Sequence, residues 1–268
     1  MAPKQPLTSG TVVAQAFRVY LDHIATLVTA ALFPLAALFL VEMTLAGSGM
    51  KPNEQMLSIL PLALLVNACL DAMAAFAAQE AREGTEPKAG LLFRRVWLTG
   101  FAPLTLGYTL AGMVMMVGFL PMLIPMAMAG ANTPPSPLVL VLLPLCMAPG
   151  LIVGGMMSLV IPLIALERMP PLQALRVSYQ VMRKQAALGM GVFGFGLLAG
   201  SMVPMLLVMM AGEGPLSPLL FLLLMGLTAP LACLGKSLLY FNLKERGELS
   251  PFIPPISPPT PPSSTPGA

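Results

Sequence analysis

The sequence predicts an all-α membrane protein: a six-transmembrane-helix bundle with short cytoplasmic interfacial helices. Two observations predict this class. Hydrophobic residues make up 57% of the 268 residues and charged residues only 9%, whereas soluble domains carry about 25% charged residues. The chain also contains long uncharged runs. Val96 to Leu166 is a run of 71 residues without Asp, Glu, Lys, Arg or His, and one spanning helix needs about 20 apolar residues.

The runs divide the chain into three parts. Residues 1–23 are expected to form a cytoplasmic N-terminal tail with an interfacial helix, and residues 24–248 the membrane domain. Residues 249–268 are expected to be a disordered cytoplasmic tail, because 8 of the last 18 residues are prolines and such a composition cannot bury a core. Proline-groove ligand patterns occur in this tail, but a plain solvated tail is the default interpretation.

Six spans follow from the uncharged runs and the turns between them. One turn is expected at Gly130–Pro137 and another around Glu213 and Pro215. Every span contains proline, which neighbouring helices can accommodate. Simple kinks are one interpretation, and broken helices that line a substrate path are the other. The expected spans are 24–46, 56–79, 98–129, 138–166, 186–211 and 216–243.

The basic residues predict the orientation. With the N-terminus in the cytoplasm, 13 of the 14 Lys and Arg residues fall on the cytoplasmic side, and only Lys51 lies outside. This asymmetry is the positive-inside pattern of inner-membrane proteins. We therefore expect a multi-pass protein of the bacterial inner (cytoplasmic) membrane with both termini in the cytoplasm.

The segments that precede spans one, three and five resemble one another. Each contains an Arg-Val pair, at Arg18, Arg95 and Arg176. Two of the segments also show a helical apolar stripe. We interpret the chain as three units, each an interfacial helix followed by a two-span hairpin; the alternative is a chance repeat in ordinary polar loops. The stripes are Val13, Phe17, Tyr20 and Ile24 in the first segment and Leu172, Leu175, Tyr179 and Met182 in the third.

The basic residues of these segments form a candidate lipid-binding rim. Basic residues near a membrane surface attract anionic headgroups by about 1 kcal/mol each. The plainer interpretation is that they only set the topology. Membrane lipids, or other membrane proteins, are the partners that this rim favours. Its candidate residues are Arg18, Arg94, Arg95, Arg176, Arg183 and Lys184.

Two opposite charges lie inside the expected spans. Asp71 in span two and Lys236 in span six each stand about eight residues, or ~12 Å, from the cytoplasmic end of their helix. Charges at such depth usually face the bundle interior and find a partner. We predict an intramembrane Asp71–Lys236 pair, with Asn67 one turn away completing a polar cluster. The alternatives are that Lys236 extends to the interface and that Asp71 is protonated or hydrogen-bonded alone.

Residues 158–185 read SLVIPLIALERMPPLQALRVSYQVMRKQ. This stretch resembles the bacterial six-span family that includes the membrane domain of glycerophosphoryl diester phosphodiesterases. The family's pattern is Pro-hydrophobic-Glu, a turn, then Ala-Leu-Arg-x-Ser-Trp, and here Tyr179 stands in place of the Trp. The C-terminal YFNLKER, from Tyr240, is similar to the family's closing motif. The resemblance spans about residues 8–248 and implies the six-span architecture. It does not imply diesterase activity, because the sequence offers no hydrolase domain. The matching positions are Pro162, Glu167, Arg176, Ser178, Tyr179 and Tyr240.

Other motifs give no chemistry. The single histidine, His23, excludes sites with two imidazoles, and the sequence offers no phosphate loop, metal motif, cofactor motif or catalytic set. Nucleic-acid binding is not indicated. Two Gly-x-x-x-Gly pairs, which start at Gly150 and Gly196, favour helix packing within the chain. We expect a non-catalytic integral membrane protein that contacts lipids or membrane partners; a small-solute or lipid transporter is the alternative.

Overall fold

The computed structural model describes residues 7–129, 137–211 and 217–253, and in these ranges it contains helices and no strand. Six of the helices are long and apolar enough to cross a membrane, in agreement with the six expected spans, although the fifth is continuous with the amphipathic helix that precedes the expected span at residue 186. They cover Ile24–Ala46, Asn53–Arg82, Phe101–Pro125, Val141–Glu167, Pro171–Met210 and Ser217–Glu245. The chain is therefore a multi-pass integral membrane protein. Most of the two expected turns lies outside the described residues, as does the tail from residue 254.

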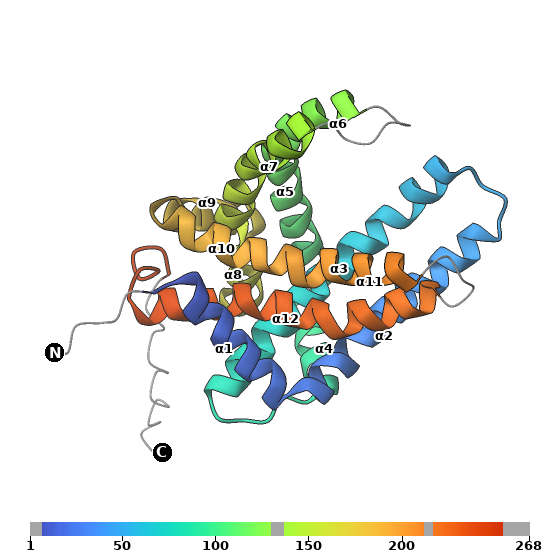
Figure 1. The fold of residues 1–268 in the computed structure, drawn as a ribbon. Coiled ribbons are helices and arrows are strands. Elements are labelled where there is room, and N and C mark those ends of the chain that lie inside the picture. The colour runs from blue at the N-terminus through green and yellow to red at the C-terminus, as the bar shows by residue number, and fades with distance from the viewer. Residues whose placement is uncertain (1–6, 130–136, 212–216, 254–268) are drawn as a thin grey trace, which may run out of the picture.

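The described helices follow one another as three units of the same kind (Figure 1). Each unit begins with a short amphipathic helix and continues with a hairpin of two spans, as the repeat predicted. The first unit contains α1 (Ser9–Asp22), α2 (Ile24–Ala46) and α3 (Pro52–Arg82). The second contains α4 (Ala89–Thr99), α5 (Phe101–Phe119), η1 (Leu120–Met122), α6 (Leu123–Ala129), α7 (Pro137–Met157) and α8 (Val160–Glu167). The third contains α9 (Pro171–Met182), η2 (Arg183–Gln185), α10 (Ala186–Leu197), η3 (Leu198–Met202), α11 (Val203–Ala211) and α12 (Ser217–Glu245).

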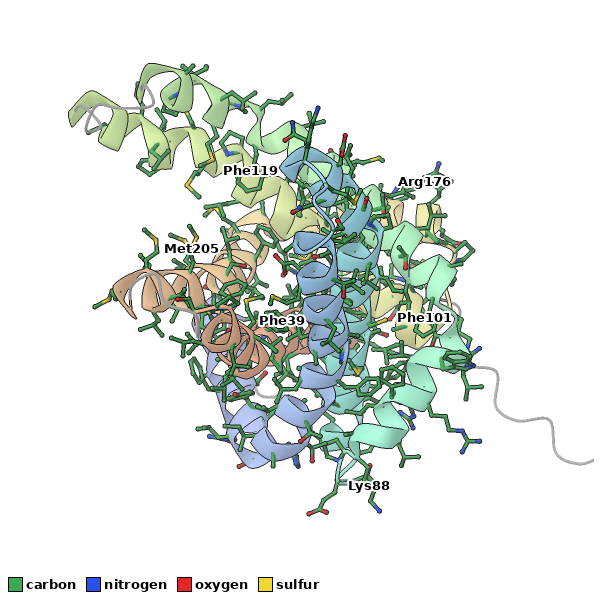
Figure 2. The ribbon with its side chains drawn as sticks, turned by 90° about the vertical axis from the view of Figure 1, so that its right-hand side faces the viewer. Phe39, Lys88, Phe101, Phe119, Arg176 and Met205 are labelled. Atoms are coloured by element: carbon green, nitrogen blue, oxygen red, sulfur yellow. The ribbon has the colours of Figure 1, made fainter. Side chains whose placement is uncertain are left out.

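The units close into a ring. Each amphipathic helix packs on the hairpin of the unit before it: α4 contacts α2 and α3, and α9 contacts α5, α7 and α8. The first unit completes the cycle, because α1 packs on α10 and α12 of the third. The hairpins diverge from this shared base in both views (Figures 1 and 2). The arrangement is pseudo-threefold.

The second span of each hairpin, here called the return span, forms the centre. The three return spans, α3, α7–α8 and α12, contact one another. In an apolar stretch of 18 residues from each return span, 56%, 67% and 44% of the stretch is buried. The corresponding shares for the first spans are 28%, 17% and 17%. One or two residues after the end of each return span, the backbone has a positive φ angle, at Gly84, Arg168 and Gly247. Glycine adopts this conformation freely, while Arg168 does so against the steric preference of an L-residue.

Besides the 3₁₀ turn η1 at Pro121 in the third span, proline breaks two of the spans. The fourth is divided at Ser158 and Leu159, between α7 and α8. Pro162 has no N–H and cannot bond the carbonyl of Ser158 four residues earlier, so the helix is interrupted there. The fifth span widens into a turn of π-helix, η3, directly before Pro204. Broken helices, and not only smooth kinks, are therefore present.

The Gly-x-x-x-Gly pairs pack inside the monomer, as expected. A Cβ on Gly154 would lie 2.3 Å from the Phe193 ring of α10, and one on Gly200 would lie 2.9 Å from Ala232 of α12. Backbone meets backbone between α7 and α10. There a Cβ on Gly155 would meet the Gly189 carbonyl carbon at 2.5 Å.

Two details differ from the sequence-based expectations. Residues 249–253, assigned to the disordered tail, form turns in which Leu249 is fully buried; the tail starts later because this leucine completes the core under α12. In α9, Met182 belongs to the buried face with Ala174, Val177 and Val181, while Leu172 and Tyr179 are exposed. The predicted stripe therefore combines residues of two different faces.

Candidate functional site

The structure brings Asp71 of α3 and Lys236 of α12 together. The Lys236 ammonium donates a hydrogen bond to Asp71 Oδ2 at 2.5 Å, and it lies 2.5 Å from Oδ1. The Asp71 side chain is 6% exposed and that of Lys236 is 21% exposed. Oδ1 has ionic contact with the ammonium but accepts no hydrogen bond with acceptable geometry. The pair is thus buried, and one of its acceptors is incompletely satisfied.

A cavity of about 210 Å³ lies beside this pair. Its wall includes both charged residues together with the polar side chains of Asn67, Tyr108 and Ser201. The remainder is mostly apolar and comes from α3, α5, α10, η3 and α12. A second cavity of about 60 Å³ shares Asp71, Tyr108 and Lys236 and extends to Ser158 at the break in the fourth span. The pair therefore lines two neighbouring cavities at the centre of the pseudo-threefold ring.

Three further residues define the environment of the pair. Asn67 lines the larger cavity, but its amide donates to the Ala63 carbonyl at 2.8 Å and not to the pair. Tyr108 of α5 and Cys233 of α12 lie close enough to interact electrostatically with Asp71 and Lys236. Neither Tyr108 nor Cys233 was expected from the sequence to belong to this cluster. A phenol inside an uncharged span was the available signal for Tyr108, and no comparable signal marked Cys233.

Ser178 repairs the break in the fourth span. This residue of α9 is fully buried, and its hydroxyl donates to the Met156 carbonyl at 2.6 Å. The same oxygen accepts from the Leu159 amide at 3.2 Å. Two backbone groups that the helix break releases are thereby satisfied. The serine at this motif position thus fixes an amphipathic helix onto an interrupted span.

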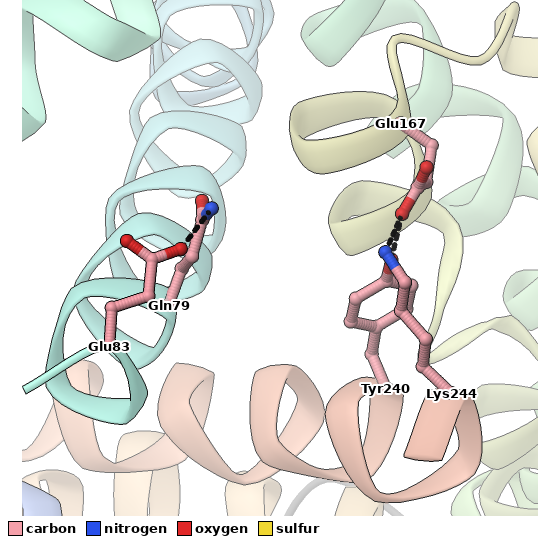
Figure 3. Close-up of polar contacts among 5 residues, drawn as sticks. All are labelled: Gln79, Glu83, Glu167, Tyr240 and Lys244. Atoms are coloured by element: carbon pink, nitrogen blue, oxygen red, sulfur yellow. Dashed lines mark hydrogen bonds and ion pairs between the residues drawn. The ribbon is translucent and has the colours of Figure 1, made fainter. Parts of the chain in front are cut away.

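Glu167, at the end of α8, binds two side chains in the C-terminal part of α12. Its Oε1 accepts from the Tyr240 hydroxyl and lies 2.6 Å from Lys244 Nζ (Figure 3). Two of the motif positions, Glu167 and Tyr240, therefore meet in space. The other polar contact in Figure 3, between Gln79 and Glu83, lies within α3 and its following turn. Pro162 of the same motif lies buried in α8.

Two other contacts tie the amphipathic helices and the return spans together. The hydroxyl of Tyr20, in α1, donates to the Leu227 carbonyl at 2.6 Å. Burial raises the pKa of this phenol, so the group remains a donor at physiological pH. Arg82 of α3 pairs with Glu245 of α12.

The rim residues divide into engaged and free groups. Arg95 Nη1 lies 3.5 Å from the buried Glu80 and its guanidinium stacks 5.7 Å above the Phe76 ring, so it is an internal contact of the first two units. The other five are exposed, and no ion pair joins them to another described residue. Figure 2 shows Arg176 and Lys88 at the periphery of the bundle. The exposed members are Arg18, Arg94, Arg176, Arg183 and Lys184.

No group of three or more His, Cys, Asp or Glu side chains that could hold a metal ion gathers within the described part of the chain. Comparison of the sequence with family models found no match. Comparison with curated proteins found no significant match, and comparison with solved structures found none. What the fold establishes is a multi-pass, all-helical membrane protein built from three similar units around a buried ion pair.

Proposed function

We propose that this protein is a non-catalytic integral membrane protein that contacts anionic lipids through a basic cytoplasmic rim. The observation that carries the proposal is the position of the exposed arginines. They lie on the amphipathic helices α1, α4 and α9, or directly after them, and each of these helices belongs to one unit of the ring. A helix with basic residues on one face and apolar residues on others lies in the headgroup region.

The orientation belongs to the same proposal. With the amphipathic helices in the cytoplasmic leaflet of a bacterial inner membrane, both termini lie in the cytoplasm. The anionic lipids of that leaflet then face Arg18, Arg176 and Arg183. The same surface is also proposed to contact other membrane proteins.

The test is retention of phosphatidylglycerol by the purified full-length protein, measured by native mass spectrometry. The variant carries Arg176→Gln, Arg183→Gln and Lys184→Gln together. The control keeps the charges through Arg176→Lys, Arg183→Lys and Lys184→Arg. Because each basic residue contributes about 1 kcal/mol, the neutral variant should retain at least tenfold less lipid than the control. Equal retention by the two variants would leave the rim with a topological role alone.

The same chain fits membership of the six-span family with the phosphodiesterase membrane domains. This proposal is supported by the roles of the motif positions: Ser178 repairs a helix break, and Glu167 holds Tyr240. An experimental structure of such a membrane domain should show the serine at its matching position bonding the backbone of an interrupted fourth span. A continuous fourth helix in that domain would remove the support.

The alternative function is transport of a small solute or lipid. A cavity beside a buried charge pair and two proline-broken spans are the observations that favour it. Translocation of a fluorescent lipid in proteoliposomes, read by chemical quenching of the outer leaflet, tests it. Transport requires faster exchange than in protein-free vesicles and a loss of exchange in Asp71→Asn. Exchange at the protein-free rate would reject lipid transport.

A further inference from the structure

We propose that the cavity beside Asp71 and Lys236 binds a zwitterionic group that carries a primary ammonium and an anionic oxygen. The source of this group is either the headgroup of a membrane lipid or a small soluble zwitterion. The site is separate from the basic rim. Its ligand is therefore distinct from the anionic lipid assigned to the rim, and the proposal does not depend on that assignment.

The first observation is an unsatisfied acceptor. Asp71 is only 5% exposed, and its Oδ1 lies 2.5 Å from the Lys236 ammonium without hydrogen-bond geometry to it. A carboxylate has about four acceptor sites, so the single ammonium leaves part of this capacity unused. Asp71 lines both cavities, so a ligand there can supply the missing N–H donor. A primary ammonium provides three such donors.

The second observation concerns Lys236. Its ammonium also has three donors, and among the described residues its hydrogen bonds go to Asp71 alone. Lys236 lines both cavities as well. An anionic oxygen placed in the cavity can therefore accept the remaining protons. The four charges then alternate in sign, with Asp71 beside the ligand ammonium and Lys236 beside the ligand anion.

Charge balance selects a zwitterion over an ion. The Asp71–Lys236 pair has no net charge, so an anionic or cationic ligand would place an uncompensated charge inside the membrane domain. Such a charge is expensive where water is scarce. A zwitterion adds one charge of each sign and leaves the site neutral. A neutral polyol provides donors and acceptors but gains no charge-assisted contact.

The volume of the cavity is large enough for a zwitterionic group. At about 210 Å³, it exceeds the roughly 150 Å³ of an engineered protein cavity that binds benzene. Gly200 and Ser201, both in the π-helical turn η3, form part of its wall. π-Helical turns occur frequently at functional sites. The apolar wall, which includes Phe193, Met115 and Met225, suits the hydrocarbon part of an amphiphile.

The experiment fills the cavity and leaves the ion pair in place. Ser201→Phe places a bulky ring at a position that lines the cavity, whereas Leu198→Phe enlarges a side chain that is 53% exposed, one turn away in η3 and outside the cavity lining. Ser201→Ala removes the hydroxyl without filling the space. Size-exclusion chromatography and circular dichroism establish that each full-length variant is folded.

The probes share one pair of acyl chains and differ in the headgroup. Dioleoyl phosphatidylethanolamine carries the zwitterion, dioleoyl phosphatidylglycerol an anion, and dioleoylglycerol neither charge. Native mass spectrometry measures how much of each stays bound to the purified protein. Free glycerophosphoethanolamine, a phosphodiester with no net charge, is added as a competitor and represents the soluble source. Competition at micromolar concentration assigns the site to a soluble zwitterion; its absence, with the lipid still retained, assigns it to a headgroup.

The expected result is one tightly held phosphatidylethanolamine, with at least tenfold lower occupancy in Ser201→Phe and unchanged occupancy in Leu198→Phe. Phosphatidylglycerol bound at the rim should respond to the rim variants and not to Ser201→Phe, which separates this proposal from the proposed function. Retention of phosphatidylethanolamine no greater than that of dioleoylglycerol would overturn the proposal if free glycerophosphoethanolamine also fails to bind. Equal zwitterion occupancy in Ser201→Phe and wild type would overturn it as well.

Discussion

At the scale of single residues, the ion pair between Asp71 and Lys236 joins two return spans in the middle of the bundle. Each charge compensates the other, because neither the carboxylate nor the ammonium is stable alone among apolar side chains. The effect on stability is therefore largest when one of the two side chains is removed. One remaining partner is an uncompensated buried charge.

The first prediction concerns this pair. Asp71→Ala or Lys236→Ala alone should destabilise the folded protein by about 3–5 kcal/mol. The exchange Asp71→Lys with Lys236→Asp should recover a large part of this loss, because the opposite charges meet again. Chemical denaturation in detergent, followed by circular dichroism, measures the change. An exchange variant no more stable than the single variants would show that the contact contributes little.

The second prediction concerns Ser178. Ser178→Ala leaves the Leu159 amide and the Met156 carbonyl without their partner in a buried place, which should cost about 1–3 kcal/mol. Ser158→Ala is the matched control, because the Ser158 hydroxyl donates only to the Gly155 carbonyl of its own turn. Thermal unfolding in detergent should rank Ser158→Ala well above Ser178→Ala in stability. The reverse ranking would contradict the role assigned to Ser178.

The two sites differ in how far the sequence could predict them. Asp71 and Lys236 are rare charges in long apolar spans, so their depth alone suggested that they meet. The role of Ser178 depends on a helix break at Ser158 and on the docking of α9 against it. The residues around Ser178 indicate neither the helix break nor the docking of α9. The same holds for Cys233, whose neighbours come from other helices.

At the scale of elements, the helices approach one another most closely where glycines face each other. In α7 and α10 the backbones at Gly155 and Gly189 leave no room for a Cβ. Membrane helices associate largely through such close packing, because lipid offers no hydrophobic driving force between them. The pair of glycines therefore positions the second hairpin against the third.

The third prediction tests this contact. Gly155→Ala and Gly189→Ala should each destabilise the protein, because the new methyl group meets the opposite backbone, which cannot move aside as a side chain would. Gly194→Ala in the same helix α10 is the control. A Cβ there meets nothing within 4 Å, and alanine favours a helix by roughly 0.5–1 kcal/mol over glycine. Denaturation in detergent should place Gly194→Ala at or above wild type, and equal losses at all three positions would contradict the packing argument.

The amphipathic helices show why one element-level prediction was wrong. The sequence predicted the positions of α1 and α9 from their apolar stripes, yet Met182 lies in the core and Leu172 lies outside. In a soluble protein an apolar stripe marks the buried face. Beside a membrane, both the core and the lipid accept apolar side chains, so periodicity identifies a helix but does not tell which apolar face packs inward.

At the scale of the whole molecule, the basic asymmetry predicts which side of the membrane the base of the ring faces. The fourth prediction uses cysteine labelling in a background that lacks the three natural cysteines. A cysteine replacing Lys88, in the exposed segment between α3 and α4, should react with an impermeant reagent only after intact cells are permeabilised. A cysteine replacing Lys51, also exposed, should react from outside.

The control and the decisive outcome come from the same pair of positions. Both cysteines should react equally in detergent, which shows that neither is hidden by the fold. Reaction of the Lys88 position in intact cells would overturn the orientation, although the six helices themselves would remain. The number and limits of those helices were predictable from the uncharged runs, whereas the ring was not, because it depends on which hairpin each amphipathic helix selects.

The closed ring has a consequence for the order of assembly. When α1 is synthesised, its partners α10 and α12 have not yet been made, so these helices cannot cover Val12, Ala16 and Tyr20. This helix therefore reaches its final place only after the sixth span, and its buried face stays uncovered until then. Cysteines replacing Gln15 and Asn242, whose side chains are hydrogen-bonded at 2.8 Å, should cross-link only once the sixth span has been inserted. The contact between α1 and α12 thus reports that the sixth span is in place.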